Sequence, residues 1–311
     1  MNPLSELVLF RTAAALYTAA TASAFVYLGT RRDSWSRWML RLLGTGAALH
    51  LLAFVLRIAA FWADPGNRFL LPINSFFGAL SFLSLAVALA FFQVEVRHRL
   101  GILGAFVLPW ACAAAWGGVW RTFSVGSTEI AALPADLQSR WMNFHPAVLM
   151  ASYALLANAF GVGVALLVQE GQVKSRRPSD LCYSLPAIEE LDALNYRLVA
   201  AALPVFALGV LLGGFWAHGA WGRFWGWDAK ETWALITALV YGVFLRQRAV
   251  AGWRGRKAVY VSMFGFACAL FTFLGVNFLS QLHGYLTIRR AGAGLPHGAA
   301  FGGDSGRGRP S

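Results

Sequence analysis

Eight apolar runs, each about as long as a bilayer is thick, dominate this sequence. A hydrocarbon core about 30 Å thick needs about 20 apolar residues per helix, and backbone groups inside lipid must find their partners within the spanning structure. The runs therefore predict an all-α, polytopic integral membrane protein with about eight transmembrane helices. The seventh run is short and begins inside a tryptophan-rich stretch. The runs cover approximately residues 8–29, 43–63, 74–95, 101–120, 146–169, 195–216, 231–247 and 258–280.

The composition agrees with a membrane protein and excludes several other classes. Of 311 residues, 58% are hydrophobic and 13% are charged, with a mean hydropathy of +0.56, whereas soluble domains average about 25% charged residues. The cysteines Cys112, Cys182 and Cys268 are far apart and form no CxxC motif. This spacing excludes a disulfide framework, a thioredoxin-like pair, a zinc knuckle and a covalent haem site within the chain itself.

The basic residues orient the spans. The net charge is +12, but the bases lie in clusters between apolar runs, so we expect no nucleic-acid partner. Alternate connections hold fifteen Lys and Arg, against five in the opposite connections before the tail. The positive-inside rule then places both termini, and residues 64–73, 121–145 and 217–230, on the extracytoplasmic side. The fifteen are Arg31, Arg32, Arg37, Arg41, Arg97, Arg99, Lys174, Arg176, Arg177, Arg197, Arg246, Arg248, Arg254, Arg256 and Lys257.

The chain divides into one transmembrane domain, residues 1–288, and a tail, residues 289–311. The tail is rich in Gly, Arg and Pro, which predicts a disordered extracytoplasmic segment. No internal repeat or second soluble domain is visible.

The sharpest local signal is a predicted extracytoplasmic loop at 216–233, which holds five of the 13 tryptophans. An interfacial aromatic belt is one explanation, but belts are spread over all helices. Here Gly222 and Gly226 allow close backbone approach. The indoles of Trp221, Trp225 and Trp227 could then cover a planar apolar ligand such as a porphyrin.

Two histidines are expected at the same surface. His145 precedes the fifth span and His283 follows the eighth, so their imidazoles could ligate a haem iron from opposite faces. His98 and His297 read as solvated basic residues.

His50 lies deep in the second span, and Arg57, seven residues further on, shares its helix face. A haem could place its iron near His50 and a propionate near Arg57. The alternative is a structural hydrogen bond for His50 and snorkelling by Arg57.

The stretch WGRFWGWDAKETWALIT, residues 221–237, resembles the tryptophan-rich WWD region of the CcsA/ResC cytochrome c assembly proteins. The resemblance is strongest over residues 190–250. It implies that His145 and His283 are the two extracytoplasmic haem ligands that flank the loop in that family. Arg246 stands where many members carry a histidine at the inner end of a span, and arginine does not ligate iron, so a transmembrane haem site of the usual form is not expected.

Other polar groups lie next to the indoles, and we expect Asp228 to be one of the haem-binding residues. Lys230 or Arg223 could pair with haem propionates, or Lys230 could form a salt bridge with Asp228 and Glu231. The segment Trp216-Ala217-His218 resembles Trp-Ala-Asn in relatives, so a histidine stands here in place of an asparagine. His218 could compete for iron or make a hydrogen bond within the loop.

The resemblance implies a haem-handling subunit of a cytochrome c synthase (a haem lyase) in a bacterial plasma or inner membrane rather than a thylakoid. Haem b, as Fe(II), would be the substrate presented for thioether attachment to the CxxCH motif of apocytochrome c. A membrane partner of the Ccs1/ResB type is implied. The alternatives are a haem exporter without ligation activity and a membrane b-type electron-transfer protein.

Overall fold

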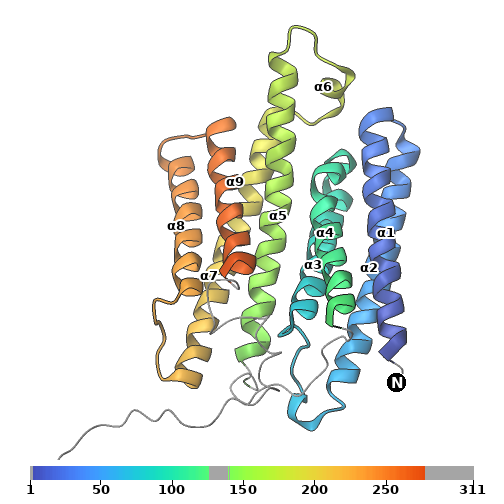
Figure 1. Cartoon of the computed structure of the whole chain (residues 1–311). Coiled ribbons are helices and arrows are strands. Elements are labelled where there is room, and N and C mark those ends of the chain that lie inside the picture. Colours follow the sequence, from blue (N-terminus) through green and yellow to red (C-terminus); the bar gives the residue numbers. More distant parts are fainter. Residues whose placement is uncertain (1–2, 126–138, 140, 277–311) are drawn as a thin grey trace, which may run out of the picture.

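The computed structural model describes residues 3–125, 139 and 141–276, and within these ranges the regular structure is entirely helical (Figure 1). The predicted all-α class is confirmed. The tail at 289–311 lies outside the described residues. The long helices are α1 (Pro3–Thr30), α2 (Asp33–Phe61), α3 (Phe76–His98), α4 (Gly104–Val125), α5 (Trp141–Lys174), α7 (Ile188–Trp221), α8 (Ala229–Val250) and α9 (Arg256–Leu270), which continues as the π-helical turn η4 (Phe271–Gly275). Short helices η1 (Pro65–Asn67), η2 (Gly101–Leu103) and α6 (Asp180–Ser184) lie in connections.

Seven helices in the described part of the chain are long and apolar enough to cross a membrane. The eighth long helix, α8, falls short because charged side chains occupy both of its ends: Lys230 and Glu231 at one, Arg246 and Arg248 at the other. This agrees with the short seventh apolar run. The largest boundary difference is in α2, which begins ten residues before the predicted run because the basic segment around Arg37 and Arg41 is itself helical.

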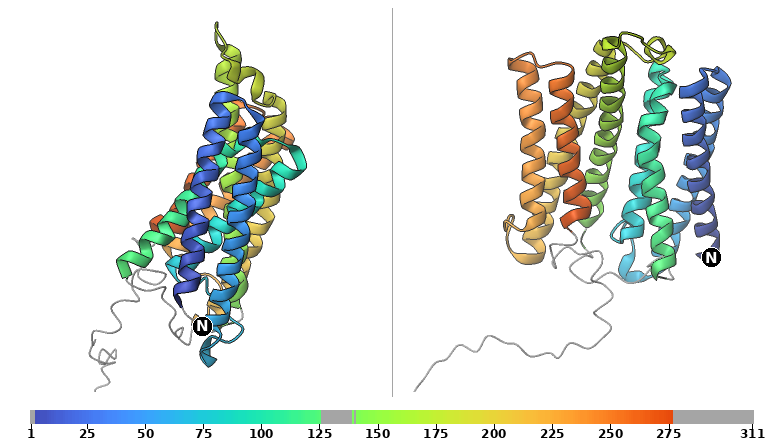
Figure 2. Two further views of the ribbon diagram at one scale, coloured as in Figure 1. Left: turned by 90° about the vertical axis from the view of Figure 1, so that its right-hand side faces the viewer. Right: turned by 45° about the horizontal axis from the view of Figure 1, so that its top comes forward.

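Successive long helices alternate in direction, and this sorts the connections between two ends of the bundle (Figures 1 and 2). We call the end that carries residues 31–32, 99–103, 175–187 and 251–255 the basic end. We call the opposite end, with residues 62–75 and 222–228, the loop end. α1 begins at the loop end, and α9 runs from the basic end toward the loop end (Figures 1 and 2).

Buried polar side chains connect neighbouring helices. Ser84 Oγ of α3 donates to the carbonyl of Ala111 in α4 at 2.8 Å. Two contacts join α5 and α7: Ser152 Oγ donates to the carbonyl of Ala202 at 3.0 Å, and Asn195 Nδ2 donates to the carbonyl of Ala159 at 2.7 Å. Such bonds average about 0.6 kcal/mol each in membrane proteins, so their main effect is to fix the register of the helices.

Buried ion pairs link helices of the bundle. Arg57 of α2 is 1% exposed, its Nη1 lies 3.0 Å from Glu6 Oε1 of α1, and its guanidinium lies 4.7 Å from the ring centre of Phe77. The snorkelling predicted as one alternative for Arg57 is wrong. A guanidinium buried among helices needs a nearby anion, and Glu6 supplies it.

At the basic end, a second buried pair joins three helices. Arg248 of α8 makes a two-pronged contact with the carboxylate of Asp192 in α7, at 2.8 and 2.5 Å. The same carboxylate accepts the backbone N–H of Gly255, just before α9, at 2.8 Å. Asp192 therefore holds α7, α8 and α9 together at the end opposite the tryptophan-rich loop.

Candidate functional site

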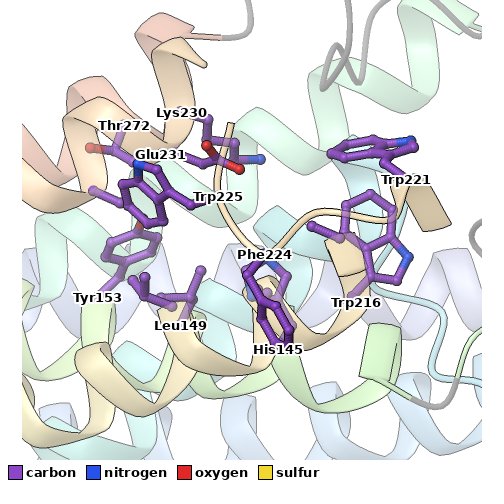
Figure 3. Close-up of a pocket in the computed structure, with 15 residues that line it drawn as sticks. His145, Leu149, Tyr153, Trp216, Trp221, Phe224, Trp225, Lys230, Glu231 and Thr272 are labelled. Atoms are coloured by element: carbon purple, nitrogen blue, oxygen red, sulfur yellow. The ribbon is translucent and has the colours of Figure 1, made fainter. Parts of the chain in front are cut away.

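A cavity of about 560 Å³ opens near the loop end, between α5, α7, the start of α8 and η4 (Figure 3). The walls are mainly aromatic and aliphatic, with polar groups on one side. The lining residues are His145, Leu149, Tyr153, Val210, Gly213, Gly214, Trp216, Ala217, Trp221, Phe224, Trp225, Lys230, Glu231, Ala234 and Thr272.

The loop beside this cavity is shorter than predicted. Instead of spanning 216–233, the non-helical part covers only residues 222–228, because α7 continues to Trp221 and α8 begins at Ala229. Gly222 ends α7 with φ 72°, a conformation that glycine adopts without strain, and its N–H donates to the carbonyl of His218 at 2.9 Å.

A capping box fixes the other end of the loop. The Asp228 side chain accepts the N–H of Glu231 at 2.8 Å, and the Glu231 carboxylate accepts the N–H groups of Gly226 and Asp228 at 2.6 and 3.4 Å. Asp228, a predicted cofactor-binding residue, is therefore the N-cap of α8, and it is not among the lining residues. A direct role for Asp228 toward haem stays a prediction.

The indoles of the loop take different positions. Trp221 and Trp225 line the cavity together with Trp216, which was not singled out from the sequence and packs edge-on against Trp221 with ring centres 4.7 Å apart. Trp227 is 69% exposed and does not line the cavity. The indole Nε1 of Trp225 is buried and has no hydrogen-bond partner among the described residues. A buried donor without a partner is unusual, and this one lies at a cavity wall.

The imidazole of His145 is held by α7. Its Nδ1 lies 2.8 Å from the carbonyl oxygen of Gly209. Since a carbonyl only accepts, Nδ1 carries the proton and Nε2 holds the lone pair, which is the tautomer of a histidine prepared to bind a metal. The ring lies against Gly213, where an added Cβ would come within 2.6 Å of Cε1 of His145. Nothing in the local sequence identifies Gly213 as a functional residue, because its partner lies on another helix.

The polar side of the cavity carries Lys230 and Glu231, in the first turn of α8 and ahead of its apolar part (Figure 3). Burial lowers the pKa of Lys230 to about 8, and the nearby Asp228 carboxylate acts in the opposite direction. The guanidinium of Arg223 lies over Gly226, where a side chain would overlap it, and 5.8 Å from the ring centre of Trp221. Arg223 is exposed and is not part of the lining.

Two further histidines from the sequence analysis, His50 and His218, do not line this cavity. His50 is fully buried, with Nδ1 3.2 Å from the hydroxyl of Tyr17 and Nε2 2.9 Å from Ser81 Oγ. Both ring nitrogens thus make the hydrogen bonds of the structural alternative. His218 is exposed and stacks on Phe224, with ring centres 4.4 Å apart. His283 lies outside the described residues, so its role as an iron ligand stays a prediction.

Comparison with known proteins relates this geometry to a family. Residues 47–283, well over half of the chain, match the family described as Cytochrome C assembly protein. The chain belongs to the cytochrome c assembly protein family. The match includes every residue that lines the cavity and ends at His283. The predicted family resemblance is confirmed.

Several cytochrome c biogenesis proteins named CcsA are similar over most of their length. The protein from Chlorella vulgaris is 32% identical over 274 residues, covering 78% of this chain and 84% of the relative. The protein from Gloeothece citriformis is 29% identical over 331 residues, covering 92% and 96%. The protein from Gloeobacter violaceus is 28% identical over 332 residues, covering 90% and 96%. This chain is therefore similar to CcsA proteins along nearly its whole length.

Proposed function

We propose that this cytochrome c assembly protein holds haem in the loop-end cavity and presents it to apocytochrome c, as the haem-handling subunit of a cytochrome c synthase. The observation that carries the proposal is His145. Its Nδ1 faces a backbone carbonyl at 2.8 Å, which orients the ring so that iron would be ligated through Nε2, and it lines a cavity with three indoles. His283 would supply the second axial ligand from the opposite face.

The lining suits the two chemically different parts of haem. Indole and phenyl faces at Trp216, Trp221 and Phe224 favour a planar apolar macrocycle. The propionates need donors, and the cavity offers the ammonium of Lys230 and the N–H of Trp225, which has no acceptor in the described part of the chain. An anion beside Lys230 would raise its pKa above the value that burial produces.

The reaction mainly requires that the haem vinyl groups and the thiols of the CxxCH motif be positioned next to each other. Each thiol of the CxxCH motif adds across one vinyl group of haem b, so that sulfur bonds to one vinyl carbon and hydrogen to the other, without net oxidation or reduction. Haem held as Fe(II) could then exchange one protein imidazole for the substrate histidine. The chain contributes a fixed geometry and a largely apolar cavity, which is catalysis by proximity.

We also propose the setting of this reaction. The loop end would face the extracytoplasmic side of a bacterial plasma or inner membrane, since the basic end carries the positive clusters. A membrane partner of the Ccs1/ResB type would help bind the apocytochrome, because the loop between α7 and α8 spans only residues 222–228. The environment of His50 disfavours the b-type electron-transfer alternative, since both of its ring nitrogens already have partners.

The test is optical spectroscopy of haem bound to the purified protein, with a coupled assay of cytochrome c maturation. His145→Gly and His283→Gly should each abolish maturation, and added imidazole should partly restore it by filling the vacant coordination position. His98→Ala, an exposed histidine at the opposite end of the bundle, is the matched control and should behave as the wild type. Full maturation by the His145→Gly, His283→Gly double variant would refute the proposal, and normal haem binding without thioether formation in the wild type would indicate a carrier.

A further inference from the structure

A larger hollow lies at the opposite end of the molecule from the aromatic cavity. It has a volume of about 920 Å³ and lies between α3, α5 and α7. We call it the basic groove. It is lined by Ala90, Gln93, Val94, Arg97 and His98 of α3, by Leu155 of α5, and by Leu194, Arg197 and Leu198 of α7.

The basic groove has two chemically distinct parts. Arg97 and His98 occupy the last turn of α3, so together with Arg197 they form a positively charged mouth. Ala90 lies seven residues before Arg97, about 10 Å deeper along the helix axis. From this depth to the mouth the walls are mostly aliphatic, and Leu155 on α5 is partly buried. The groove therefore joins a cationic opening to an apolar interior.

The described residues offer no ion-pair partner for the charge at the mouth. Neither Arg97 nor Arg197 has an ion-pair partner among the described residues, and the lining includes no acidic side chain. The buried carboxylates of Glu6 and Asp192 are paired with other arginines. Guanidinium groups beside apolar walls favour a ligand with an anionic head and an apolar body.

We propose that the basic groove is a binding site for an anionic phospholipid, with the phosphate at Arg97, Arg197 and His98 and one acyl chain between α3 and α7. An acyl chain fits better than a porphyrin because the lining contains no Phe, Tyr or Trp ring, unlike the loop-end cavity. Basic pockets between transmembrane helices on the cytoplasmic side are typical sites for anionic lipid head groups. The assignment does not depend on haem binding.

A lipid in this position would have a structural effect. Its acyl chain would contact α3 on one side and α7 on the other, with Leu155 of α5 between them. A ligand that binds only the folded state raises thermal stability. Anionic phospholipid should therefore raise the Tm of the wild-type protein more than a zwitterionic lipid with the same chains.

The experiment is native mass spectrometry of the full-length protein in detergent, with added phosphatidylglycerol or phosphatidylcholine carrying identical chains. The wild type should retain phosphatidylglycerol preferentially. Arg97→Gln and Arg197→Gln should each weaken its retention about fivefold, and the pair about 25-fold, because a basic residue near an anionic lipid surface contributes about 1 kcal/mol. The matched control, Arg176→Gln with Arg177→Gln, removes two charges from the same end outside the groove and should leave retention unchanged.

A second variant tests the apolar part of the groove. Ala90→Phe fills the interior without changing charge and should also weaken phosphatidylglycerol retention, while inorganic phosphate alone should not compete. The Tm of each lipid-free variant shows whether it is folded. If the double variant does not fold, the Arg97→Gln and Arg197→Gln single variants provide the test. Equal retention of both lipids, no difference between groove and control variants, or no effect of Ala90→Phe would overturn the proposal. The proposal would also be overturned if the Arg97→Gln, Arg197→Gln double variant lost haem binding in a titration but retained phosphatidylglycerol.

Discussion

The imidazole of His145 depends on two glycines of α7 for its position. The carbonyl of Gly209 fixes the proton on Nδ1, and the missing side chain of Gly213 leaves room for the ring. Leu149 packs one turn further along α5 and lines the same cavity. The proposed iron ligand therefore belongs to α5 but is positioned by α7. A substitution on α7 should change the position of the imidazole even though His145 itself is unchanged.

Gly213→Ala should weaken haem retention about 5- to 150-fold, because overpacking of this kind costs about 1–3 kcal/mol and the new Cβ would lie 2.6 Å from the imidazole of His145. Gly219→Ala, on the same helix with no atom within 4 Å of the added Cβ, is the matched control. It should retain haem and gain slightly in stability, since alanine favours a helix. Haem content per purified protein is the measurement, and equal content in both variants would contradict the placement of His145.

At the scale of elements, the seven-residue connection between α7 and α8 decides which indoles meet the cavity. Gly222 turns the chain out of α7, and the box of Asp228 and Glu231 starts α8. Between them Trp227 has φ 57°, an uncommon conformation for a residue with a side chain. The turn places Trp225 at the cavity and leaves Trp227 largely exposed.

Trp225→Ala should therefore reduce haem retention about 2- to 10-fold, the loss expected from a stacking contact of about 0.5–1.5 kcal/mol. Trp227→Ala should leave haem retention near that of the wild type and is available for contacts with a partner protein. Both changes are measured by pyridine haemochrome analysis, with membrane insertion checked by fractionation. If Trp227→Ala lost as much haem as Trp225→Ala, the loop would have to adopt another conformation when haem is bound.

At the scale of the whole molecule, the alternation of helices separates two sites of different chemistry. The loop-end cavity is aromatic and includes His145, whereas the basic groove is aliphatic and carries two arginines. The two sites lie at opposite ends of a bundle whose helices are long enough to cross a membrane. Each site would then face a different compartment.

Orientation gives a direct test in intact bacterial cells. In a variant whose native cysteines are replaced by serine, Gly219→Cys at the loop end should react with a membrane-impermeant maleimide added outside. Arg177→Cys at the basic end should react only after the membrane is permeabilised, since the positive clusters are retained on the cytoplasmic side. The reverse pattern would refute the proposed orientation and place the loop-end cavity in the cytoplasm.

The sequence by itself determined the class of fold, the order of the spans, the separation of the basic connections and the family. These properties depend on local composition: apolar length fixes a span, and a motif such as residues 221–237 is contiguous. The helix ends were less well determined, because α7 stays helical through Trp221 and α2 begins well before its apolar run.

Only the tertiary structure decided which side chains meet. Arg57 pairs with Glu6, 51 positions away, His50 binds Tyr17, 33 positions away, and His145 binds the backbone of Gly209, 64 positions away. The periodicity of one helix shows which face a residue occupies but not which residues of another helix lie opposite it. That depends on how the helices pack, and packing therefore determines the tautomer of His145, the partner of Arg57 and the choice of Trp225 over Trp227 at the cavity.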